Sequence, residues 1–88
     1  MLERFKNYLI EEGYREYTQS GNLSTVYDYC KRINKVCEEE KCTLDELAFN
    51  IDKIVKKYDV GGEKEKSGRT SHNSVINALK RFKEFLGK

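Results

Sequence analysis

The sequence predicts an all-α fold, a compact bundle of four to five short helices. The chain has 88 residues, no proline, 36% charged residues and 38% hydrophobic residues. Its apolar residues recur at helical spacing in several segments, and no run alternates apolar and polar residues as a half-buried strand would. A chain of this length buries one small core. We therefore expect a single helical domain over residues 1–88.

The first helix is expected over about residues 2–12. Leu2, Phe5, Tyr8 and Leu9 fall on one side of it, which is the pattern of a helix with one buried face. Gly13 follows and is a natural left-handed terminator.

The second helix is expected over residues 25–40. Residues 14–23 contain Ser20-Gly21-Asn22 and have the composition of a turn. Ser24 then stands where a helix needs an N-cap. The apolar face of this helix comprises Val26, Tyr29, Cys30, Ile33, Val36 and Cys37.

The third helix is expected over residues 44–58. Thr43 and Glu46 have the spacing of a capping box, in which each side chain bonds the other residue's amide. Asn50 is a weak helix former, so the sequence leaves open whether this segment is split near residue 50. Its expected buried residues are Leu44, Leu47, Ala48, Ile51, Ile54, Val55 and Tyr58.

The last helix is expected over residues 71–86, after a flexible loop over residues 59–70. Ser71 or Thr70 is the expected cap. Phe85 should lie at the edge of the buried stripe. That stripe comprises Val75, Ile76, Leu79, Phe82 and Leu86.

No catalytic constellation is evident, and we expect this chain not to be an enzyme. The loop between Gly62 and Gly68 differs from a phosphate-binding loop in glycine spacing and lacks the lysine. His72 is the single histidine and has no evident orienting acid. The sequence indicates no cofactor and no small-molecule substrate.

The three cysteines, Cys30, Cys37 and Cys42, are expected to be reduced thiols. An odd number without an export signal argues against a disulfide framework. Cys30 and Cys37 are seven residues apart on one expected helix, about 10.5 Å, which is too far for two ligands of one zinc ion. With no apolar run long enough to cross a bilayer, we expect a cytoplasmic protein and no metal site or membrane partner.

Charge placement indicates a binding role more clearly than total charge does. The net charge is only +2, but residues 69–88 hold five Lys or Arg against one acid, Glu84. Lys and Arg attract phosphates, and short polar side chains at helix starts can donate to them. Ordinary solvated helices carry the same residue types, so residues alone leave both interpretations open. The candidate DNA-binding residues are Ser24, Thr25, Lys31, Arg32 and Lys35 on the second helix, and Arg69, Thr70, Ser71, His72, Asn73, Asn77 and Lys80 on or just before the last.

Two segments resemble the amino-terminal core-binding domain of tyrosine recombinases and phage integrases, also called the SAM-like integrase domain. One runs from Leu23 to Ile33 and includes Ser24, Thr25 and the central Tyr29; the other runs from Ser71 to Leu86. Phe5-Lys6-Asn7-Tyr8-Leu9 also takes the place of that family's initial Phe-x-x-Tyr-Leu segment.

The resemblance implies a four-to-five-helix bundle that clamps duplex DNA, with the second and last helices toward the major groove or its flanking phosphates. Strand exchange in that family belongs to a separate catalytic domain, so the chain would position DNA without cutting it. A recombinase catalytic domain, or a second copy on DNA, would be a further partner. The consecutive Glu38, Glu39 and Glu40 would repel DNA if they lay near the groove.

Two other roles remain open. One is a helical protein–protein interaction domain of a larger mobile-element or defence protein, with Tyr14, Tyr17, Tyr27 and Phe85 as an apolar patch. The other is a self-associating helical unit without a nucleic-acid role.

Overall fold

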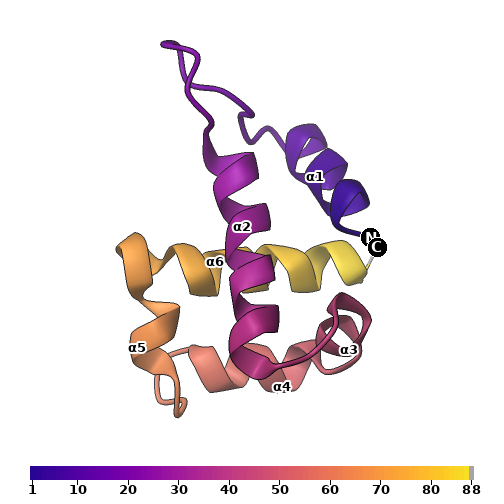
Figure 1. Cartoon of the computed structure of the whole chain (residues 1–88), viewed down its shortest axis with the longest axis vertical. Coiled ribbons are helices and arrows are strands. Elements are labelled where there is room, and N and C mark those ends of the chain that lie inside the picture. The colour runs from indigo at the N-terminus through magenta and orange to yellow at the C-terminus, as the bar shows by residue number, and fades with distance from the viewer. Residues whose placement is uncertain (88) are drawn as a thin grey trace.

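A computed structural model describes residues 1–87, which form a bundle of six helices (Figure 1). The bundle measures 37 × 26 × 20 Å along its principal axes. The helices are α1 (Leu2–Glu11), α2 (Thr25–Glu40), α3 (Leu44–Phe49), α4 (Ile51–Tyr58), α5 (Glu65–Gly68) and α6 (Thr70–Leu86). The predicted all-α class is confirmed.

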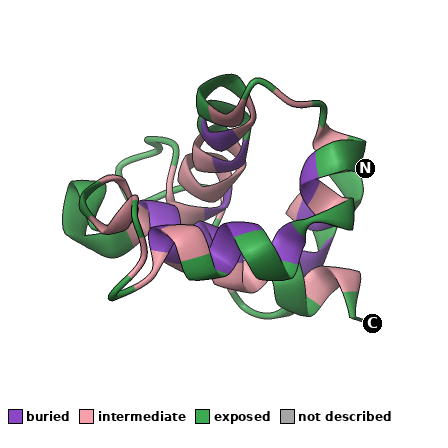
Figure 2. Ribbon diagram, turned by 90° about the horizontal axis from the view of Figure 1, so that it is seen from below, coloured by how far each residue is buried: buried purple, intermediate pink, exposed green. Residues whose placement is uncertain are grey.

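The two long helices, α2 and α6, cross at the centre of the bundle (Figure 1). Helix α1 packs against both, and α4 packs against α6 and α5. Their buried faces meet in one core (Figure 2). At its centre, the rings of Phe5 and Phe82 pack edge to face with centroids 5.1 Å apart, an arrangement favoured by the aromatic quadrupole.

The helical periodicity located most of the core correctly. Of the expected residues, Leu2, Tyr29, Cys30, Cys37, Leu44, Ala48 and Leu86 are only partly buried. Phe85 lies at the edge of the core, as expected. Ala78 is fully buried and was not expected to be.

The third expected helix is divided at Asn50, the alternative that the sequence left open. The Asn50 side chain donates a 3.0 Å hydrogen bond to the Glu46 carbonyl oxygen. Such a bond competes with the helical backbone bonds, and α4 begins afresh at Ile51. The predicted capping box of Thr43 and Glu46 is confirmed, with bonds of 2.8 and 3.2 Å.

Residues 59–70 differ from the expected loop because they contain α5. Two glycines in this segment permit close backbone packing. A Cβ at Gly62 would lie 2.2 Å from the Lys56 carbonyl oxygen, and one at Gly68 would lie 2.0 Å from that of Tyr58. Because these glycines have no side chain, the segment packs closely against α4. The sequence, which indicated a solvated linker here, did not predict this contact.

Ser24 occupies the predicted N-cap position of α2, although its side chain makes no capping bond there. The predicted cap of α6 is wrong. Neither Thr70 nor Ser71 caps α6, because Ser71, His72 and Asn73 adopt left-handed backbone angles, with φ of 53°, 57° and 68°. The regular part of α6 therefore begins after Asn73.

No helix within residues 1–87 is both long enough and apolar enough to cross a membrane.

Candidate nucleic-acid interface

The middle of α2 lies beside the junction between α5 and α6. The Arg32 guanidinium donates a 2.8 Å hydrogen bond to the Ser71 hydroxyl. Between α2 and this junction is a groove of about 140 Å³, whose lining includes Arg32, Lys35, Glu39 and Thr70. The structure thus brings together part of each of the two predicted polar faces.

The α5–α6 junction is held in place from α4. Gly68 is buried against the backbone of Tyr58, the last residue of α4. The Tyr58 hydroxyl lies within hydrogen-bonding distance of the Glu39 and Glu40 carboxylates at the end of α2 and has one proton to donate to either. The Ser67 hydroxyl donates a 3.4 Å bond to Glu39. Tyr58 therefore links α2, α4 and the junction.

Arg32 is the most constrained cation in this region. Its side chain is 21% exposed, and its Nε lies 3.3 Å from the Asp28 carboxylate. That Nε is buried and poorly aligned for a hydrogen bond with any partner among residues 1–87. Arg32 is therefore held by ion-pair attraction on one side and by Ser71 on the other.

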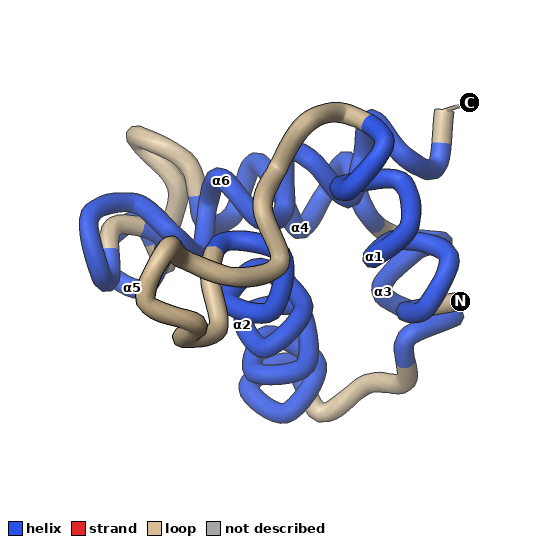
Figure 3. The backbone as a smooth tube through the Cα atoms, turned by 90° about the horizontal axis from the view of Figure 1, so that it is seen from above, coloured by secondary structure: helices blue, strands red, loops and turns tan. Residues whose placement is uncertain are grey.

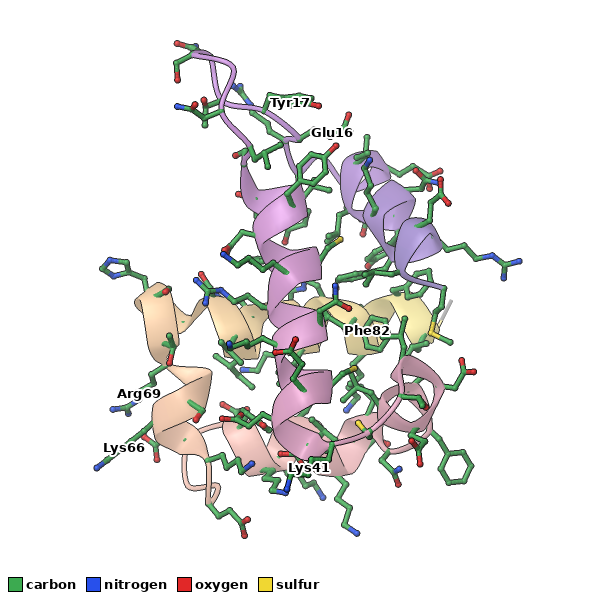
Figure 4. All side chains as sticks on the ribbon, viewed as in Figure 1. Glu16, Tyr17, Lys41, Lys66, Arg69 and Phe82 are labelled. Atoms are coloured by element: carbon green, nitrogen blue, oxygen red, sulfur yellow. The ribbon has the colours of Figure 1, made fainter. Side chains whose placement is uncertain are left out.

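The remaining cations of this region are exposed, and of these Lys35 also lines the groove. Lys35 pairs with Glu38 at 3.9 Å, and Arg69 pairs with Glu65 at 2.7 Å. Figure 4 shows Lys66 and Arg69 pointing away from the body at the α5 corner. We call this region the basic surface; it comprises Lys31, Arg32, Lys35, Lys66, Arg69, Thr70, Ser71, His72 and Asn73.

Two ion pairs of the basic surface, those of Lys35 and Arg69, have an exposed cation and are therefore weak. The side chains of Lys35 and Arg69 are 73% and 62% exposed. Exposed pairs contribute about 0–1 kcal/mol, so an incoming phosphate can replace the carboxylate. Lys31 is exposed and has no carboxylate within ion-pair range in residues 1–87.

Four of the predicted binding residues lie outside the basic surface. Lys80 pairs with Asp59 at the end of α4, at 3.4 Å, so its side chain extends along the α4 side of α6. Asn77 is half-buried on α6, while Ser24 and Thr25 are half-buried at the opposite end of α2 from the groove. The helical wheel placed these residues on polar faces, but neighbouring helices decide which polar faces adjoin.

The acidic end of α2 is partly neutralised by the fold. Glu40 is only 10% exposed and bonds the ammonium groups of Lys57 and Lys64 at 2.8 and 2.9 Å. Burial alone would raise the pKa of Glu40, but hydrogen bonds from Lys57, Lys64 and Tyr58 outweigh it and lower the pKa to about 2. Glu39 does line the groove, so one carboxylate of this acidic end remains in the wall of the groove.

Sequence reasoning missed Lys66, because residues 59–70 were expected to be a loop without a defined place. The local signal was present, since Glu65 and Arg69 are four residues apart and pair as helix neighbours do.

The aromatic residues proposed as a protein-binding patch lie in three clusters. Tyr14 packs against Tyr29, and Tyr17 packs against Tyr27, with centroids 5.7 and 5.9 Å apart. Phe85 packs against Phe5, Tyr8 and Phe82 at the edge of the core. The four residues thus do not form one continuous apolar surface.

The three cysteines are free thiols, each partly buried. Within residues 1–87, no group of three or more His, Cys, Asp or Glu side chains is arranged to hold a metal ion.

Comparisons of this chain with protein-family models, with curated proteins and with solved structures find no match.

Proposed function

We propose that this chain is a DNA-binding module of the site-specific recombinase or integrase kind, which positions duplex DNA and does not itself catalyse strand exchange. The observation that carries the proposal is the Arg32–Ser71 contact. Through it the predicted polar faces of α2 and the α6 start become one surface, with exposed cations along its rim.

The physical basis is attraction between that rim and the phosphate backbone. Each phosphate neutralised by Lys or Arg releases condensed counterions, and this term supplies most non-specific affinity. Asp28, Glu38, Glu39 and Glu65 accompany the cations. The net attraction is therefore modest, and binding should weaken steeply as salt is raised.

The polar residues Thr70 to Asn73 would position the duplex. Their side chains are exposed beside the cations, and hydroxyl and amide groups donate to phosphate oxygens. The left-handed turn places them on the outside of the α6 start.

The proposal is tested by recording backbone amide shifts of the labelled protein during titration with short duplex DNA, first at low salt and then at physiological ionic strength. We expect changes clustered at residues 31–35 and 66–73, weaker at the higher salt. No change at low salt, where phosphate attraction is strongest, would overturn the proposal in favour of a protein partner.

A pair of lysines provides a matched test of the surface. Replacing Lys31 and Lys35 by alanine should weaken binding and reduce the dependence of log K on log salt by about 2, since each phosphate contact contributes about 0.9. Lys53 and Lys56 are equally exposed on α4, outside the basic surface. Replacing them should leave that slope unchanged.

A further inference from the structure

A hairpin-like arm, residues 15–24, projects from the body at the amino end of α2 (Figures 1 and 3). Its two sides are joined by backbone bonds from Ser24 to Glu16 and from Thr18 to Asn22, both 2.8 Å. Between these bonds, Tyr17 and Leu23 face each other as an antiparallel bridge.

The arm is ordered by its own contacts. At the tip, the Thr18 and Ser20 hydroxyls are 3.0 Å apart, and the Asn22 side-chain amide donates to Ser20 at 3.2 Å. At the base, the Tyr17 ring packs against the ring of Tyr27, and Figure 4 shows Tyr17 and Glu16 where the arm leaves the body. The tip is therefore held ready for a partner, which reduces the entropy lost on binding.

The composition of the arm differs from that of the rest of the chain. Residues 17–24 include no charged side chain, although 36% of the whole chain is charged. All of them except Ser24 are exposed. The tip thus offers water only hydroxyl, amide and apolar groups.

The arm lies on the same side of α2 as the α5–α6 junction. Both the front view and the view from above place its tip over that side (Figures 1 and 3). The tip stands beyond the end of α2 opposite the groove, so a duplex that lies against the basic surface and runs along α2 would extend toward it.

From this placement we propose that the arm tip contacts base edges of the bound duplex through Gln19 and Asn22, and so supplies sequence preference. The inference rests on the proposed DNA-binding function. Phosphate contacts fix position, whereas base contacts specify sequence. Gln and Asn side chains are the groups that pair with the N6 and N7 atoms of adenine, whereas Ser and Thr contact bases with less selectivity.

The free groups on the tip fit this role. Within residues 1–87, the Gln19 side chain makes no hydrogen bond; those of the tip join Thr18, Ser20 and Asn22. The Asn22 amide uses one N–H on Ser20, which leaves its oxygen and second N–H available. Without charge, the tip has no long-range attraction to the phosphates and can enter a groove of the duplex.

The test is enrichment of bound duplexes from a random-sequence pool at physiological ionic strength, for the parent, for Gln19→Ala and for Asn22→Ala. The Gln19→Ala substitution leaves the hydrogen bonds of the turn intact. The matched control is Asn7→Ala, an exposed amide on α1. We expect the parent and the control to enrich one motif containing A·T pairs. Gln19→Ala should bind random DNA with an unchanged salt dependence but lose about 5- to 150-fold preference at one position.

The outcomes separate the two proposals. If the parent fails to bind any duplex, the proposed function itself is wrong. If the parent binds duplexes without enriching a motif, or if Gln19→Ala and Asn22→Ala both enrich the parental motif unchanged, DNA binding stands and the inference about the arm is overturned. If the arm instead contacts a protein partner, the experiment gives one of the two results named in the previous sentence.

Discussion

The Arg32 guanidinium of α2 and the Ser71 hydroxyl at the start of α6 lie 2.8 Å apart, although 39 residues separate them along the chain. The contact couples two elements that each hold part of the basic surface. Its two partners differ in what they contribute, because Arg32 brings charge and Ser71 brings an uncharged hydroxyl, which accepts this bond.

Arg32→Ala and Ser71→Ala should therefore affect DNA binding differently. Ser71→Ala keeps the charge and removes one exposed hydrogen bond, so we expect a change in unfolding free energy of about 1 kcal/mol or less. Arg32→Ala should weaken DNA binding and reduce the salt slope by about 1. DNA titrations at several salt concentrations measure the slope for each variant, and urea unfolding measures the change in stability. An unchanged slope in Arg32→Ala would remove Arg32 from the interface.

The helices could be predicted from the sequence because their signals are local. Ser24, after a segment of turn composition, marked the start of α2, and the Thr43–Glu46 pair marked the start of α3. Asn50 was recognised as a weak position, and its side chain does end α3.

The junction could not be predicted, because its determinants join distant segments. Gly68 looks like a linker glycine until Tyr58 is seen against it. The left-handed turn at residues 71–73 contains no glycine, so the residue type that most strongly indicates positive φ was missing. Lys80 was assigned to the binding face because a helical wheel gives the direction of a side chain but not the residues around it. In the structure, the ion pair with Asp59 holds the Lys80 side chain on the α4 side.

Gly68→Ala should disturb both stability and the proposed interface. A Cβ there would lie 2.0 Å from the Tyr58 carbonyl oxygen, so α5 must shift. Overpacking of this kind costs about 1–3 kcal/mol, measurable by urea unfolding. We also expect weaker DNA binding, since α5 carries Lys66.

Gly87→Ala is the matched control for Gly68→Ala. Its Cβ would lie 3.6 Å from the nearest atom, an ordinary contact, and its φ of −83° suits any residue. Unfolding should change little. Equal losses in the two variants would show that close packing at Gly68 is not the cause.

Acid should destabilise the protein through Glu40. Its pKa is about 2 in the folded chain against an ordinary 4.5, so the folded state holds the ionised form more strongly than the unfolded state does. The resulting stability, about 3 kcal/mol, is present above pH 4.5 and is lost as the pH falls toward 2. Urea unfolding at pH 7, 4 and 2.5 measures it.

Glu40→Gln should flatten this pH dependence, because the amide does not titrate. Glu38→Gln is the control: that side chain is 75% exposed, and exposed pairs contribute little. If Glu40→Gln loses stability in acid as steeply as the parent, other carboxylates account for the effect.

Cys37 should resist alkylation at neutral pH. Burial, together with the neighbouring Cys42 thiol, raises the pKa of Cys37 to about 11. The thiolate is the reactive form, and an ordinary thiol has a pKa of about 8.5. At pH 7.5, Cys37 should therefore react with iodoacetamide about two orders of magnitude more slowly than glutathione. Peptide mapping by mass spectrometry follows each site separately. In urea, where burial is lost, all three cysteines should react alike; rapid labelling of Cys37 in the folded protein would show that its thiol is open to solvent.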